Sequence, residues 1–170
     1  MSRSKNKVNW CLDKAKRELS KGQKHRGLVK GDSDIQEAKK HIKKAEHNFR
    51  AVLSFEKAGF SDWSVSAIFY TIYHCFLAII TKNGYESRNQ ECTVALVKYL
   101  IEEGKIKIDD EIIYEFENTD HKDRHQSNTI ELRENFQYGT ETSIEDGRLT
   151  EFKEICKKAI DQAKNIVYSS

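Results

Sequence analysis

The 170-residue chain contains no proline, although average usage of about 5% would supply eight or nine in a chain of this length. Proline is most costly in the interior of a helix, so a fully helical chain loses nothing by lacking it. The chain also lacks any segment rich in Val, Ile and Thr with sustained strand-like alternation. Together these absences predict an all-α fold, formed by one domain at this length.

Charge is absent from the 19 consecutive residues Trp63 to Thr81, although Asp, Glu, Lys and Arg make up 33% of the chain. A run of this length can span a bilayer. Each polar group within it would then need a partner in lipid, and the polar residues of the run include Ser64, Ser66, Tyr70, Thr71, Tyr73 and His74. We therefore interpret the run as the central helix of a soluble bundle, buried on nearly all sides, and expect no membrane partner.

The four cysteines are far apart, with no CxxC pair, and no apolar export signal follows the basic N-terminus. A metal site is the alternative interpretation, but the ligand spacing of zinc sites is missing. We predict that these cysteines are reduced core residues of a cytoplasmic protein, not disulfides or zinc ligands, and we expect no metal and no cofactor. The residues concerned are Cys11, Cys75, Cys92 and Cys156.

Negative charge is scarce in the first 50 residues, which hold 15 Lys and Arg against 6 Asp and Glu. Residues 51–170 hold 14 against 21, so balances of +9 and −7 underlie the net charge of +2. A solvated helix face with a basic arm explains this asymmetry. That is the interpretation we favour, and a basic footprint for a phosphate-bearing partner is the alternative. Charge alone leaves both interpretations open.

Apolar residues recurring every three or four positions predict a series of helices joined by short turns. Such helices form an antiparallel up-and-down bundle over residues 32–170, with four to five main helices and shorter ones. Residues 1–31 form an amphipathic helix and a basic connector that pack on it. The expected helices run from Val8 to Leu19, from a cap at Asp32 or Ser33 to Lys57, from Ser61 or Asp62 to Asn83, from Asn89 to Glu103, from Asp109 to Asn118, from Thr129 to Tyr138 and from Ile144 to Tyr168.

Four short elements carry a family resemblance: Lys44-Ala45-Glu46, Phe69 to Phe76, Gly84-Tyr85, and Arg133 to Gly139 before a long final helix. In order and spacing, they resemble the HEPN-domain family over roughly residues 32–167. The resemblance implies a bundle of four or five helices that commonly forms a homodimer. It also implies partners, because many members are linked with small nucleotidyltransferases, RNA or nucleotides.

Active members of that family are metal-independent ribonucleases with an Arg-x(4–6)-His motif at the dimer cleft. An arginine fork binds the phosphate, and a histidine moves the proton at neutral pH. Here four residues separate Arg133 from Tyr138, and none of the eight arginines precedes a histidine at that spacing. Tyrosine titrates near pH 10 and is a poor base at pH 7. We therefore assign no catalytic residue, although Arg133 and Tyr138 are the catalytic candidates, and we take Arg133, Asn135 and Tyr138 as ligand-binding candidates.

Simpler roles compete at each candidate position. Arg133 can form a surface ion pair, and Tyr138 can pack on a neighbouring helix. His74 is interpreted as a neutral, hydrogen-bonded core histidine. Tyr70 and Tyr73 are interpreted as core aromatics rather than a platform for stacking nucleotides.

His121 and His125 precede the arginine in a polar segment and could replace the missing histidine only with a different backbone geometry. Their spacing with Asp123 would also suit a divalent metal, but the segment offers no third ligand, so we interpret it as solvated surface. Gln90 stands where related sequences often have a histidine after the Gly-Tyr turn.

Two functions remain. The favoured one is a dimeric module that binds a nucleotide, RNA or a nucleotidyltransferase partner without strong catalysis. The alternative is a toxin-like, metal-independent ribonuclease, as in toxin–antitoxin systems, in which Arg133 contacts the scissile phosphate. The missing histidine favours the first function.

Overall fold

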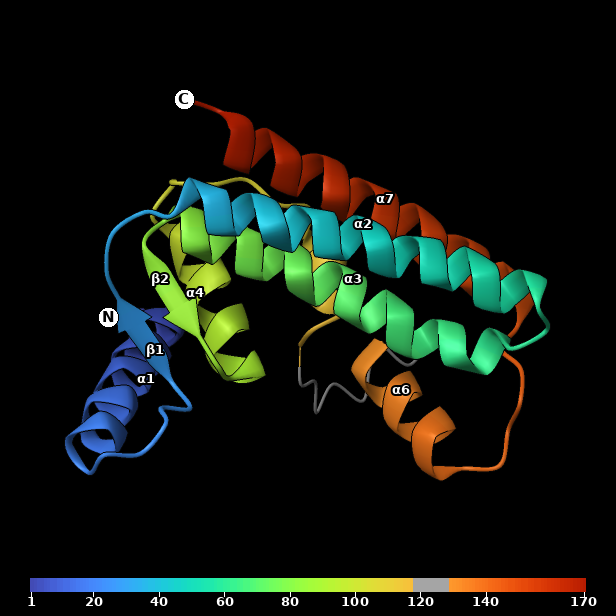
Figure 1. Ribbon diagram of the computed structural model, residues 1–170, viewed down its shortest axis with the longest axis horizontal. Coiled ribbons are helices and arrows are strands. Elements are labelled where there is room, and N and C mark those ends of the chain that lie inside the picture. Colours follow the sequence, from blue (N-terminus) through green and yellow to red (C-terminus); the bar gives the residue numbers. More distant parts are fainter. Residues whose placement is uncertain (118–128) are drawn as a thin grey trace.

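The computed structural model describes residues 1–117 and 129–170. It shows a helical bundle and, beside it, a smaller N-terminal arm formed by residues 1–31 (Figure 1). Helices hold 72% of the described residues, which confirms the predicted all-α class. They are α1 (Arg3–Ser20), α2 (Ile35–Lys57), α3 (Ser61–Lys82), α4 (Gln90–Glu102), α5 (Asp110–Tyr114), α6 (Thr129–Tyr138) and α7 (Asp146–Tyr168). Two short strands accompany them, β1 (Leu28–Lys30) and β2 (Tyr85–Ser87).

Helix α3 lies at the centre of the bundle. It packs most extensively on α2, and also contacts α7, α6 and α4, with α2 and α7 running along it in Figure 1. By length and composition alone, α3 could cross a membrane, but 61% of its apolar window is buried inside the bundle. Such burial is typical of the core helix that the charge-free run predicts.

Local capping explains where the helices begin and turn. The Asp34 side chain accepts a hydrogen bond from the Glu37 N–H at 2.9 Å, so the cap of α2 lies one or two residues later than the predicted Asp32 or Ser33. After α3, Gly84 has φ +85°, and a Cβ there would stand 2.6 Å from the Gly31 carbonyl oxygen. Only glycine fits this turn, because it must combine positive φ with close contact between two backbones.

The two strands pair antiparallel, with Val29 opposite Glu86. The predicted basic connector within residues 1–31 therefore contains a strand, β1, that the sequence analysis missed. A three-residue strand is too short for apolar and polar alternation to be recognised in the sequence. In the fold, this small sheet joins the N-terminal arm to the turn that follows α3 (Figure 1).

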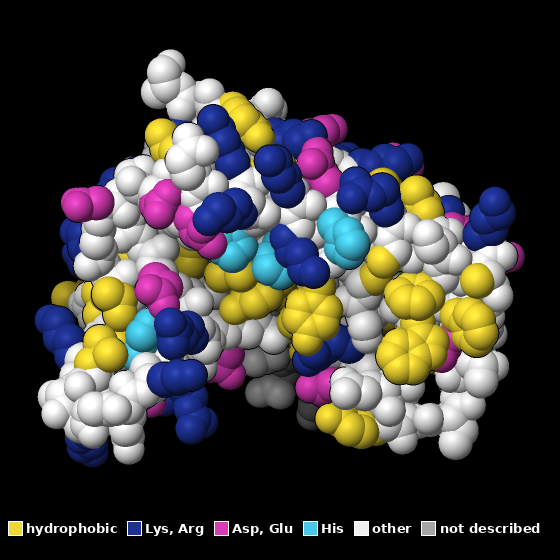
Figure 2. All heavy atoms as spheres, viewed as in Figure 1, with side chains coloured by type: hydrophobic (Ala, Val, Ile, Leu, Met, Phe, Trp, Pro, Cys, Tyr) yellow, Lys and Arg dark blue, Asp and Glu magenta, His cyan; other side chains and the backbone are white. Residues whose placement is uncertain are grey.

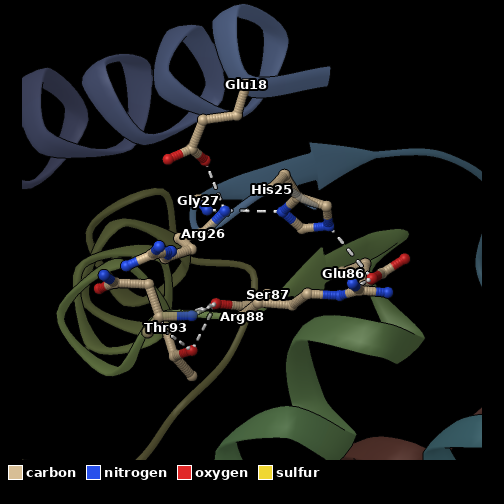
Figure 3. Close-up of polar contacts among 9 residues, drawn as sticks. Glu18, His25, Arg26, Gly27, Glu86, Ser87, Arg88 and Thr93 are labelled. Atoms are coloured by element: carbon tan, nitrogen blue, oxygen red, sulfur yellow. Dashed lines mark hydrogen bonds and ion pairs between the residues drawn. The ribbon is translucent and has the colours of Figure 1, made fainter. Parts of the chain in front are cut away.

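A buried histidine connects the arm to β2 (Figure 3). The Gly27 N–H donates to His25 Nδ1 at 3.4 Å, so the ring proton is on Nε2, which donates to Glu86 at 3.1 Å. Arg88 Nε donates to the same carboxylate oxygen at 2.9 Å. Although partial burial acts to raise the pKa of Glu86, the hydrogen bonds from His25 and Arg88 lower it below its ordinary value. Glu86 therefore stays ionised and holds both donors.

A disulfide between Cys11 and Cys92 joins α1 to α4, with the two Cα atoms 5.9 Å apart. The prediction that all four cysteines are reduced is therefore wrong for this pair, and it is confirmed for Cys75 and Cys156, which are free and buried. The two bonded cysteines are 81 residues apart in the sequence, and no local sequence pattern identifies so distant a disulfide partner. The predicted cytoplasmic location rested partly on reduced cysteines, and disulfides are rare in that compartment; it stays a prediction.

Replacing both bonded cysteines with alanine should lower the free energy of unfolding by about 2–4 kcal/mol, because the cross-link closes a long loop in the unfolded chain. Urea unfolding with and without a reductant measures this difference. The reductant should destabilise the unmodified protein and leave Cys11→Ala/Cys92→Ala unchanged. Equal stability of the oxidised and reduced proteins would contradict a stabilising role.

Candidate functional site

Helix α6 carries the sequence-predicted site residues, and a buried carboxylate fixes where it begins. Glu115, which follows α5, accepts hydrogen bonds from the Thr129 N–H at 2.8 Å and the Thr129 hydroxyl at 2.7 Å. Arg148 of α7 approaches the other carboxylate oxygen at 3.5 Å. Burial raises the pKa of Glu115 above its ordinary value, against the opposite effect of these donors. The start of α6 is thus joined to α5 and α7.

The Arg133 guanidinium lies over an aromatic stack of the core. Its central carbon is 4.2 Å from the centre of the Phe69 ring, and Phe69 stacks on Phe116 with ring centres 4.7 Å apart. The Arg133 Nε atom is buried without a hydrogen-bond partner. No carboxylate of the described residues forms an ion pair with Arg133, so the predicted surface ion pair is absent there. A cation held by stacking keeps its donors for an anion.

Tyr138 and Asn135 do not join Arg133 at this position. Five residues rotate a helix by about 140° relative to its starting direction, and the Tyr138 side chain is 82% exposed. The prediction that Tyr138 packs on a neighbouring helix is therefore wrong. Asn135 is exposed too, and its carbonyl accepts a hydrogen bond from the Gly139 N–H at 2.8 Å as α6 ends. Within one chain, Arg133 is therefore the only one of the three ligand-binding candidates at this position.

Two histidines face each other across the α2–α3 contact. His41 Nδ1 and His74 Nδ1 are 3.0 Å apart, so one ring donates a hydrogen bond and the other accepts it. Burial lowers the pKa of His74 to about 4, with smaller effects from His41 and from Lys44. Burial also lowers the pKa of His41. The predicted neutral, hydrogen-bonded His74 is confirmed, but its ring is only half-buried and not enclosed in the core.

His74 lines a hollow of about 400 Å³ between α2 and α3. Two aromatic side chains of α3 border it, with Trp63 59% and Tyr70 44% exposed. The interpretation of Tyr70 as a core aromatic is therefore wrong. It holds better for Tyr73, which is half-buried and stacks on Phe116. Figure 2 shows His, Lys and Arg side chains together with hydrophobic ones over this face.

Two further residues of this hollow were missed by sequence reasoning. Lys44 and Asn48, one turn apart on α2, also line it. The Asn48 Nδ2 atom is buried without a hydrogen-bond partner. The spacing of Trp63, Tyr70 and His74 at i, i+7 and i+11 could have revealed a shared face on α3.

The polar segment with His121, Asp123 and His125, which we interpreted as solvated surface rather than a metal site, lies outside the described residues. Within residues 1–117 and 129–170, no group of three or more His, Cys, Asp or Glu is placed to hold a metal ion.

The family profile described as HEPN domain matches residues 38–169. The chain belongs to the HEPN domain family. No curated protein is significantly similar to it. The matched region of this HEPN domain begins within α2 and includes α6 and α7, so Arg133 and the α2–α3 hollow both lie inside it. Helix α1, β1 and the disulfide residue Cys11 precede it.

Acid should destabilise this HEPN domain through His74. A histidine in the unfolded chain titrates near 6.5, whereas His74 in the fold titrates at about 4. As the pH falls from 6.5 towards 4, the unfolded chain takes up a proton that the folded chain does not, so the free energy of unfolding should fall. His74→Gln should reduce this dependence in urea unfolding at pH 7.5 and pH 5. His47→Gln, at an exposed position of α2, is the control. An identical pH dependence in all three proteins would contradict the assignment.

Proposed function

We propose that this protein is a dimeric HEPN-domain module that binds RNA or nucleotides through their phosphates and has little or no nuclease activity. The observation that carries the proposal is the state of Arg133. Its guanidinium is held on Phe69 and has no carboxylate partner among the described residues, while an exposed tyrosine occupies the position of the family histidine.

The chemistry of these two side chains separates binding from cleavage. A guanidinium offers a planar fork of donors that matches phosphate oxygens and stays charged at all relevant pH values. Cleavage also needs a group that transfers a proton near neutral pH, which contributes about 10²–10⁴ in rate. Tyrosine is in general a poor proton carrier near neutral pH, so the arginine supports binding and a tyrosine in place of the histidine does not support catalysis.

An exposed apolar surface supports the dimer. Large hydrophobic side chains of α2, α3 and the turn between them are 43% exposed or more: Leu53, Phe60, Trp63 and Tyr70. Hydrophobic side chains gather near the α2–α3 turn in Figure 2. Exposed apolar surface of this kind marks interaction sites, and twofold pairing is the commonest way for a soluble protein to cover it.

Arg133→Ala should weaken binding of a short single-stranded RNA by about 10-fold or more, because hydrogen bonds from a charged group to phosphate are lost. Fluorescence anisotropy at several salt concentrations measures this loss. Arg50→Ala, at an exposed arginine of α2, is the matched control and should change affinity less. Circular dichroism checks that each variant is folded.

The same RNA, incubated with the unmodified protein and a chelator, should stay essentially intact. Tyr138→His should raise cleavage if α6 presents that position to the RNA. Chelator-insensitive cleavage that Arg133→Ala abolishes would overturn the proposal in favour of the ribonuclease. Absence of salt-sensitive binding would overturn it in favour of a module whose partner is a protein, such as a nucleotidyltransferase.

Light scattering at micromolar concentration should give close to twice the chain mass of 19.8 kDa. Phe60→Ser/Trp63→Ser should shift the protein towards monomer, because it removes apolar area from the proposed interface. Trp10→Ser is the control, since Trp10 is comparably exposed but lies on α1. A monomer at every concentration would refute the dimer.

A further inference from the structure

The N-terminal helix α1 carries a cationic stripe interrupted by one tryptophan. Six residues recur at intervals of four, three, four, three and four positions, which places them within an arc of about 80° around the helix. The segment 1–31 that contains them holds ten Lys and Arg against two Asp and Glu. The members of the α1 stripe are Arg3, Lys7, Trp10, Lys14, Arg17 and the C-cap residue Lys21.

The tryptophan presents a flat surface between two cations. Lys7 Nζ is 4.3 Å and Lys14 Nζ 5.7 Å from the centre of the Trp10 ring, and the side chain remains 47% exposed. Such cation–π contacts orient an exposed ring without covering it completely. Trp10 is therefore available to stack on a planar group that approaches from solvent.

Most of the stripe's charge is available to a ligand. Arg3, Arg17 and Lys21 are exposed, and no carboxylate of the described residues pairs with any of them. Lys7 pairs with Glu91 and Lys14 with Glu18, each at 3.1 Å. Ion pairs on a surface contribute little free energy, so phosphate oxygens can replace these carboxylates at small cost.

One face of α1 packs on the rest of the protein. Val8, Cys11 and Ala15 are buried there, and the disulfide holds Cys11 to Cys92 of α4. A Cβ on Gly27 would stand 2.2 Å from the Cys11 carbonyl oxygen, which shows how closely the chain before β1 packs on this helix. A helix that binds a membrane surface inserts its apolar face. In α1 that face is already occupied, whereas Arg3, Trp10, Arg17 and Lys21 of the stripe are exposed to solvent.

Further contacts fix how α1 packs on the chain that precedes β1. Glu18 of α1 accepts a hydrogen bond from the Arg26 N–H at 2.5 Å (Figure 3). Together with the β1–β2 pairing and the disulfide, this contact holds α1 in one position. Binding of a ligand to the stripe therefore costs little conformational entropy in the helix.

We propose that the α1 stripe binds single-stranded nucleic acid, with backbone phosphates along its cations and one unstacked base on Trp10. The 18 residues of α1 extend over about 27 Å, long enough for several nucleotides. A duplex does not present the flat face of a base to a side chain, whereas a single strand does. This surface lies outside the region that matches the family and uses neither Arg133 nor the α2–α3 hollow.

Two variants test separate parts of this surface with a fluorescent single-stranded RNA. Arg3→Gln/Arg17→Gln/Lys21→Gln should weaken binding at least 10-fold and reduce the slope of log affinity against log salt by about 2, since each phosphate contact on a single strand contributes about 0.7. Trp10→Ala should weaken binding about 5- to 150-fold and leave the salt slope unchanged. Circular dichroism confirms folding of both.

A charge-matched triple variant on other elements controls for net charge. Lys105→Gln/Lys107→Gln/Lys158→Gln changes three exposed cations away from α1 and should affect binding much less. An equal loss in both triple variants would overturn the proposal, because bulk charge would then explain it. Unchanged affinity for the α1 triple and for Trp10→Ala would overturn it as well.

The Arg133→Ala variant distinguishes this surface from the α6 site. If Arg133→Ala weakens binding and the α1 variants do not, the α1 proposal fails and the proposed function stands. If the α1 variants weaken binding and Arg133→Ala does not, only the α6 site is rejected.

Vesicles of phosphatidylcholine with and without phosphatidylserine provide the last comparison. Binding to anionic vesicles that matches binding to RNA, and that the α1 triple variant also loses, would overturn the assignment to nucleic acid.

Discussion

Burial of α3 is the constraint on which the rest of the bundle depends. This helix has no charged residue between Trp63 and Thr81, so water must be excluded from most of its surface. Helices α2, α4, α6 and α7 each contribute to that cover. Their positions follow from this requirement: α6 brings Arg133 onto Phe69, and α2 brings His41 against His74.

The neighbouring helices do not cover α3 completely, and the candidate functional groups lie where they leave it exposed. Trp63 and Tyr70 remain exposed beside the α2–α3 hollow, and Asn48 keeps a buried donor without a partner there. At α6, the guanidinium of Arg133 stacks on the edge of the aromatic core instead of pairing with a carboxylate. The buried Asn48 Nδ2 and Arg133 Nε atoms, which have no hydrogen-bond partner, carry a cost in free energy.

The N-terminal arm is attached by a different physical principle. The arm buries little apolar area, because only a few apolar residues of α1 are buried. The disulfide and the His25–Glu86 contact also hold it in place. A covalent link and charged hydrogen bonds can fix an element that buries little area. This attachment leaves the cationic side of α1 free, so the protein can present positive charge on the arm as well as at Arg133.

The sequence by itself determined the helices, because apolar spacing, capping residues and glycine turns are local properties of the chain. It also predicted the HEPN resemblance, the central place of α3 and the neutral state of His74. It did not predict the β1–β2 pairing or the bond between Cys11 and Cys92, since each joins distant segments without a local signal. Only the tertiary structure decided that Tyr70 and Tyr138 face outward and that Arg133 stacks on Phe69. Exposure of a side chain depends on which neighbours cover it, and the packing of whole helices settles that choice.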